Sequence, residues 1–205
     1  MKIDQIKGRL LLKKPKIIDP LNETEIIKDV MLADGKIEEI GMINDEHNVK
    51  SIDCDGLILT HGFCDLHVHF RDPGNGDKET VESGCQSALA GGFTRVCTMP
   101  NTEPPIDSPE LTNYIIESTK NLPVHIHPIG AVTKKQAGLE ISEMGLMIES
   151  GAVAFSDDGL PIQNGLVMRK ALEYSKMFNV PIINHAEDDC LRANGLMNEG
   201  IVSTK

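Results

Sequence analysis

Residues 63–74 read FCDLHVHFRDPG, and the interpretation of the whole chain starts from this stretch. It opens as an apolar strand, Phe63–Phe70, in which His67 and His69 lie two residues apart. Side chains two apart in a strand point to the same face, so both imidazoles can share one divalent metal ion. Neutral imidazole suits zinc. Pro73-Gly74 marks a loop at the carboxyl end of the strand, where α/β folds place their chemistry.

A bare HxH pair has an alternative interpretation, as two polar residues on a solvent-facing sheet edge. The context favours the metal. Leu66, Val68 and Phe70 are apolar and are expected together on the opposite face of the strand.

Strand-like and helix-like segments alternate from Gly62 onward, which predicts a parallel sheet with crossover helices. The expected strands are Phe63–Phe70, Thr94–Met99, Val124–Ile129, Val153–Ser156 and Pro181–His185. The expected helices are Lys78–Ala90, Pro109–Lys120, Leu139–Ser150 and Gly165–Phe178. This pattern alone fits either an open doubly wound sheet or the first five strands of a (β/α)8 barrel, which needs eight strands and about 250 residues.

The first 57 residues instead predict a small β-rich domain. Strand-like segments occur at residues 9–12, 16–19, 29–32, 37–40, 49–52 and 57–60. Asp34-Gly35 predicts the turn of a hairpin.

Two further strand ends carry metal-binding side chains. Ser156-Asp157-Asp158-Gly159 ends one strand with two carboxylates, and Asn184-His185 ends the next. Taken singly, an Asp before Gly can cap a turn, and a lone His can be a hydrogen-bonded structural residue. Together with the first strand they supply ligands from three strands, which indicates convergence at one end of a parallel sheet.

The chain resembles the dihydroorotases, members of the amidohydrolase superfamily. The resemblance covers nearly the whole chain and is strongest from Gly62 to Asp107. HxH marks only the superfamily, whereas the segments HFRDPG (69–74) and MPNT (99–102) are more specific and separate the chain from hydantoinases, dihydropyrimidinases and allantoinases. The resemblance implies an α/β fold. Residues 58–205 would form the first five strands of a metal-dependent (β/α)8 barrel, and residues 1–57 would form part of a β-sandwich domain that precedes it.

The resemblance also implies roles for individual residues. His67, His69, Asp158 and His185 would bind one or two zinc ions, and Arg71 and Asn101 would hold the substrate's carboxylate. Other family members use a carboxylated lysine as a bridge, but here that strand ends in Ser156-Asp157-Asp158 with no lysine, so such a bridge is not expected. The family's catalytic aspartate is expected beyond Lys205. His125 and His127 form a second HxH pair, interpreted as structural.

Composition limits the possible partners. The formal net charge is −11, and no run of basic residues occurs, which disfavours nucleic-acid binding. The chain opens with the polar segment MKID and has no bilayer-spanning apolar stretch. Five cysteines without a CxxC pair fit free thiols in a reducing cytoplasm.

The resemblance to the dihydroorotases implies the function: reversible, zinc-dependent cyclisation of N-carbamoyl-L-aspartate to L-dihydroorotate. We expect a homodimer, with aspartate carbamoyltransferase as a candidate partner, and a longer enzyme of which residues 1–205 are an inactive part. Two alternatives remain: a non-catalytic dihydroorotase-like scaffold beside aspartate carbamoyltransferase, and another cyclic amidohydrolase of the hydantoinase or allantoinase kind.

Overall fold

The computed structural model describes residues 8–44 and 49–204, and its contacts divide the chain into two compact units, Met1–His61 and Gly62–Lys205. The expected domain boundary lies slightly earlier, between residues 57 and 58. The contacts place it later because β7 (Ile58–Thr60) pairs in parallel with β2 (Lys16–Asp19) and so belongs to the first unit.

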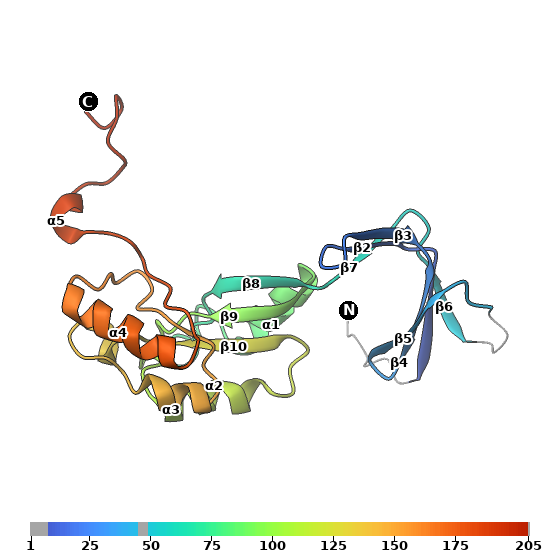
Figure 1. Cartoon of the computed structure of the whole chain (residues 1–205), viewed down its shortest axis with the longest axis horizontal. Coiled ribbons are helices and arrows are strands. Elements are labelled where there is room, and N and C mark those ends of the chain that lie inside the picture. The colour runs from blue at the N-terminus through green and yellow to red at the C-terminus, as the bar shows by residue number, and fades with distance from the viewer. Residues whose placement is uncertain (1–7, 45–48, 205) are drawn as a thin grey trace. The chain divides into compact units, whose positions relative to one another are not determined.

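The first unit contains two small sheets (Figure 1). One has the order β5-β4-β1-β6, formed by Lys36–Gly41, Asp29–Ala33, Arg9–Lys13 and Lys50–Asp53. The other has the order β3-β2-β7, and its strand β3 (Thr24–Ile27) was not predicted. The predicted hairpin is confirmed: Asp34 and Gly35 have φ values of 48° and 77° between β4 and β5, as a tight turn of this kind requires.

The second unit is built on a parallel sheet of order β11-β10-β9-β8, whose middle strands lie side by side in Figure 1. Its strands are β8 (Phe63–Val68), β9 (Phe93–Thr98), β10 (His125–Gly130) and β11 (Ala154–Phe155). The helices between and after them are α1 (Val81–Ala90), α2 (Pro109–Thr119), α3 (Met144–Glu149), α4 (Gly165–Met177) and α5 (Asp189–Arg192). This alternation of parallel strands and helices confirms the predicted α/β class.

Several predicted elements are shorter than expected, among them α3 and the fifth strand. Helix α3 starts at Met144 rather than Leu139, because the preceding residues form a short 3-10 turn and a bridge from Thr133 to Ile141. The expected fifth strand, Pro181–His185, is reduced to one parallel bridge between Phe155 and Ile182. Beyond it the backbone turns on itself, since the N–H of Glu187 donates to the carbonyl of His185.

The two faces of the sheet pack differently. Val96 and Ile126 belong to the main core, which includes buried residues of α1, α2, α3 and α4. On the opposite face Cys97, Met99 and Ile129 form a second, smaller cluster. Because side chains alternate along a strand, neighbours such as Val96 and Cys97 point to opposite faces of the sheet.

A bulge in β8 sets which face the two histidines occupy. Asp65 pairs with Val96 and Val68 pairs with Thr98, so three steps along β8 match two along β9. The extra residue turns His67 and His69 onto the face of Cys97; without it they would face the helices. Leu66 is therefore 65% exposed and does not share the apolar face expected for it.

Asp65 stabilises this bulge, because its Oδ1 accepts a hydrogen bond of 3.0 Å from the N–H of His67.

Among the residues that the structure describes, no helix is both long and apolar enough to cross a membrane.

Candidate metal centre

Three side chains from two strand ends converge. His67 and His69 come from the end of β8, and Asp158 follows β11. The Nε2 atoms of the histidines lie 3.3 Å apart, and Oδ1 of Asp158 lies 3.3 Å from Nε2 of His67 and 3.9 Å from Nε2 of His69. Two imidazole nitrogens and one carboxylate oxygen thus face a common point.

These separations fit a divalent ion. Ligands about 2.0–2.2 Å from a tetrahedral zinc lie roughly 3.3–3.6 Å from one another. The three measured separations fall at or near that range without rearrangement of the backbone. The donor set, two imidazoles and a carboxylate, is also one that zinc accepts. The group can therefore hold a metal ion.

The backbone conformation of Asp158 orients its side chain. Its φ is 52°, a left-handed conformation that Asp and Asn adopt more readily than most residues. Its N–H donates to Oγ of Ser156 over 2.9 Å. The side chain is only 14% exposed, so few water molecules compete for its carboxylate.

The neighbouring carboxylate, Asp157, has a different position. It is buried, and it accepts hydrogen bonds from the backbone N–H of Thr133 over 3.0 Å and from the hydroxyl of Thr133. Burial raises the pKa of Asp157, and the bonds from Thr133 partly offset that rise. Asp157 thus ties the end of β11 to the segment after β10, and only Asp158 reaches the site.

Asn101 lies between two members of the group. Its Oδ1 is 2.9 Å from Nδ1 of His69, and its Nδ2 donates a hydrogen bond to Oδ2 of Asp158. The family resemblance implies that Asn101 binds substrate. Its contact with two potential metal ligands was not predicted, because nothing in the spacing of residues 99–102 indicates where the amide points.

His185 lies outside this group. Its Nε2 is 3.0 Å from Oε2 of Glu187, and its side chain is half exposed. The structure therefore brings together three of the four predicted metal ligands, and the fourth pairs with an acidic neighbour. The strand that would carry His185 pairs only at Ile182, three residues earlier.

Arg71 lies in the loop that follows β8. Its backbone N–H donates to the carbonyl of Glu79 over 3.2 Å, and its carbonyl accepts from the N–H of Asn75 over 2.8 Å. Within residues 8–44 and 49–204 the guanidinium forms no ion pair or hydrogen bond, which leaves it available to an anionic ligand.

The loops that carry Arg71 and Asn101 are joined to each other. The N–H of Glu103 donates to the carbonyl of Pro73 over 3.0 Å. Gly74, at φ 100°, lies so close to Glu103 that a Cβ atom on it would be 2.2 Å from the Glu103 carbonyl oxygen. The two predicted substrate-binding residues therefore sit on loops whose backbones are in direct contact.

The second HxH pair lies elsewhere on the sheet. Nε2 of His127 is 3.3 Å from Nη1 of Arg95 on the neighbouring strand. Burial lowers the pKa of His127, and the charges of Arg95 and His125 lower it further. A neutral imidazole that accepts from Arg95 is consistent with the structural role expected for this pair.

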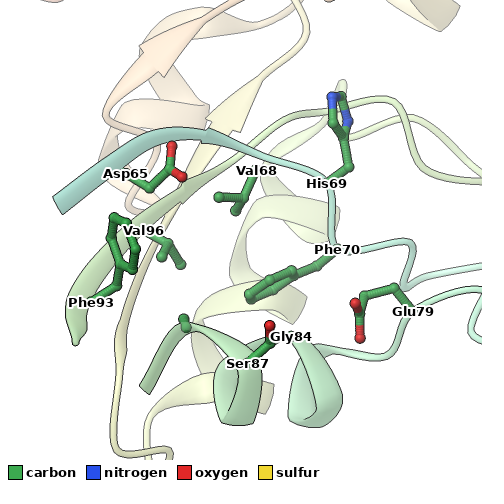
Figure 2. A pocket seen from close by; sticks show the side chains of 10 residues that line it. Asp65, Val68, His69, Phe70, Glu79, Gly84, Ser87, Phe93 and Val96 are labelled. Carbon is green, nitrogen blue, oxygen red and sulfur yellow. The ribbon is translucent and has the colours of Figure 1, made fainter. Parts of the chain in front are cut away.

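A hollow of about 270 Å³ lies between β8 and α1 (Figure 2). Apolar side chains such as Val68, Phe70 and Phe93 line much of it. His69 is the one member of the metal group in its lining, so the hollow and the candidate metal centre are different features.

Comparison with known proteins shows similarity to dihydroorotases. A family model described as "Dihydro-orotase-like" matches residues 56–204. The chain is 43% identical over 197 residues to a dihydroorotase of Solibacter usitatus, with 96% of this chain and 46% of that protein covered. It is 46% identical over 198 residues to a dihydroorotase of Citrifermentans bemidjiense, with 96% and 47% covered. The chain thus spans about half the length of these curated relatives.

Solved structures share the fold. An L-hydantoinase from Arthrobacter aurescens matches with a TM-score of 0.72 at 20% identity, over 95% of this chain and 45% of that one. A dihydroorotase crystal structure matches with a TM-score of 0.58 at 14% identity, over 86% and 50%. At such identities these likenesses concern the fold alone.

Proposed function

The chain belongs to the dihydroorotase-like family, and from that premise we propose that the full-length protein is a zinc-dependent dihydroorotase. It would interconvert N-carbamoyl-L-aspartate and L-dihydroorotate. The observation that carries the proposal is the convergence of His67, His69 and Asp158, with ligand separations that suit a divalent ion, in a chain that is 46% identical to a dihydroorotase.

Each residue of the site has a task in this reaction. His67 and His69 would hold zinc through Nε2, Asp158 through Oδ1, and His185 would complete the set. Bound zinc supplies a water molecule of lowered pKa and polarises a carbonyl oxygen.

Arg71 would bind the substrate's carboxylate. A guanidinium offers two parallel N–H donors to one carboxylate, which fixes orientation as well as charge. Asn101 would add its second amide hydrogen, since only one is directed at Asp158. Transfer of a proton to the leaving nitrogen requires a further acid–base group. We assign it to an aspartate outside residues 1–205.

We also propose the finer architecture. The second unit would be the first five strands of a (β/α)8 barrel, and the first unit part of a β-sandwich. The fold shared with the hydantoinase, at a TM-score of 0.72, supports this arrangement. We further propose a cytoplasmic homodimer, with aspartate carbamoyltransferase as a candidate partner; size-exclusion chromatography with and without that enzyme would test both associations.

The proposed activity is tested on the full-length protein, stripped of metal and then reloaded with zinc. We expect ring opening of L-dihydroorotate, followed by its ultraviolet absorbance, to appear only in the reloaded protein. Absence of turnover in a folded, zinc-loaded protein would instead favour the non-catalytic scaffold. Turnover of hydantoin or allantoin in preference to dihydroorotate would favour another cyclic amidohydrolase.

Arg71→Lys in the full-length protein is expected to raise KM for N-carbamoyl-L-aspartate by about 10–100-fold while zinc content stays the same. Lysine keeps the positive charge but loses the two-pronged geometry, and about 1.4–2.8 kcal/mol of binding corresponds to that range. Arg169→Lys on the exposed face of α4 is the matched control, because among the described residues that guanidinium forms an ion pair with Glu173 alone. Unchanged kinetics in Arg71→Lys would refute the assignment.

A further inference from the structure

We propose that Asn101 is a positioning residue of the metal centre, whose single amide fixes both the tautomer of His69 and the orientation of the Asp158 carboxylate. This inference deepens the proposed function and rests on its metal site. It assigns Asn101 a task that precedes substrate binding and does not depend on it.

The hydrogen-bonding capacity of the partners determines the direction of both contacts. An ionised carboxylate can only accept, so the Asn101 group that faces Oδ2 of Asp158 must be the NH₂. The amide oxygen then faces Nδ1 of His69 at 2.9 Å. Because that oxygen can only accept, Nδ1 of His69 must carry the hydrogen. The opposite amide orientation would place two acceptors against each other at Asp158.

The tautomer decides what His69 can do. With the hydrogen on Nδ1, a neutral His69 has a free lone pair on Nε2. That is the atom that lies 3.3 Å from Nε2 of His67 and 3.9 Å from Oδ1 of Asp158. The same amide occupies Oδ2 of Asp158 and so turns Oδ1 toward the histidines. One side chain thus prepares two ligands at once.

The backbone around Asn101 is suited to this task. Val68 accepts from the N–H of Met99 over 2.9 Å, which joins the residue after β9 to β8. The carbonyl of Pro100 accepts from the N–H groups of Thr102 and Ile106, and the hydroxyl of Thr102 donates to Pro104. Partners outside the ligand set commonly hold metal-binding histidines in this way, and their loss typically weakens metal binding by about 10–100-fold.

His67 provides an internal comparison. Within the part of the chain that the structure describes, no hydrogen bond to Nδ1 of His67 occurs, and its side chain is 52% exposed. Among the described residues, Asn101 thus supports His69 and Asp158 and leaves His67 without such a contact. We expect the effect of losing Asn101 to show in how these two ligands bind.

The test is the affinity of the full-length, substrate-free protein for zinc, measured by competition with a chromophoric chelator. Asn101→Ala removes both contacts, and Asn101→Leu removes them while keeping a similar side-chain volume. Asn164→Ala is the matched control, because it removes the same amide from the N-cap of α4, where Asn164 accepts from the N–H of Leu166. Visible absorption of the cobalt-substituted proteins reports ligand geometry independently of activity.

We expect zinc affinity about 10–100-fold weaker in both Asn101 variants, an altered cobalt spectrum, and wild-type values for Asn164→Ala. If Asn101 serves only to bind substrate, its variants will keep wild-type zinc affinity and cobalt spectrum and change KM alone, and that result overturns the inference. Because no substrate is present, the outcome is independent of which cyclic amide the enzyme hydrolyses. Weakened affinity in folded variants of an enzyme that fails to act on dihydroorotate would still support the inference.

Discussion

Asp158→Asn in the full-length protein is expected to abolish hydrolysis of dihydroorotate and to weaken zinc binding by more than about 100-fold, a loss beyond that typical of a supporting residue. The identical change one residue earlier, Asp157→Asn, is expected to leave zinc bound. Adjacent carboxylates of one DDG segment should thus separate cleanly into a ligand and a structural anchor.

The result at Asp158 follows from charge and hydrogen bonding, since the backbone tolerates the change. Asparagine accepts the left-handed φ of 52° nearly as well as aspartate does. Its amide oxygen would accept from Nδ2 of Asn101, as Oδ2 of Asp158 now does. Its NH₂ would then point at Nε2 of His67, where Oδ1 lies at 3.3 Å in the native protein. An NH₂ group cannot bind a metal ion, and the negative charge is gone.

The result at Asp157 follows from burial. Its two oxygens accept from the backbone N–H and the hydroxyl of Thr133. An asparagine there has only one accepting oxygen, so its NH₂ faces either the backbone N–H of Thr133, which cannot accept, or the Thr133 hydroxyl, whose own hydrogen then loses its acceptor. Losing one such buried bond costs about 1–3 kcal/mol. The loss should appear as a lower unfolding midpoint.

Metal analysis, activity and thermal unfolding of both variants, side by side, check this pair of expectations. Loss of zinc from folded Asp157→Asn, or full zinc occupancy in Asp158→Asn, would contradict the assignment of Asp158 as the ligand.

The sequence contained enough to predict the α/β class of the second unit and most of its helices and strands. Apolar segments that alternate with amphipathic ones predicted its α/β class, because strand and helix periodicities are local properties. The residue pattern HxH placed two imidazoles on one face for the same reason. Which face that would be was not predictable, since it depends on the bulge after Asp65, a feature of pairing between β8 and β9.

The unpredicted features of the site depend on contacts between segments that are distant in the sequence. The DDG segment has two carboxylates, and no local pattern favours the second as the ligand; that preference rests on the family resemblance. In the structure Thr133, 24 residues away, donates hydrogen bonds to the Asp157 carboxylate. Asp158 is therefore the carboxylate that reaches the histidines. The role of Asn101 likewise depends on partners 32 and 57 residues away. His185 was predicted from the end of an apolar segment, but pairing of that segment stops at Ile182.

Gly74→Ala is expected to destabilise the full-length protein clearly more than Gly138→Ala, although both glycines have a positive φ. Their values are 100° and 70°, and a Cβ atom in either conformation is strained, at about 1–3 kcal/mol. Gly138 has open space where a Cβ would be added. At Gly74 the new atom would meet the backbone of Glu103, which no side-chain rotation can relieve, at a further cost of about 1–3 kcal/mol.

The same change should also affect the site, because it separates the loop of Arg71 from the loop of Asn101. The contact between them includes the 3.0 Å hydrogen bond from the N–H of Glu103 to the carbonyl of Pro73. A shift of one loop relative to the other moves Arg71 away from the metal ligands that Asn101 contacts. We therefore expect Gly74→Ala to raise KM, and Gly138→Ala to leave it unchanged.

Urea unfolding followed by circular dichroism, together with steady-state kinetics, tests both parts of this expectation. Comparison of the two variants cancels most of the cost of the positive φ and leaves the backbone collision as the main difference. Equal unfolding midpoints would mean that the two loops separate at little cost and that their contact does not hold Arg71 in place. A lower midpoint for Gly74→Ala with a raised KM would show that the glycine of the HFRDPG segment serves binding through the approach of one backbone to another.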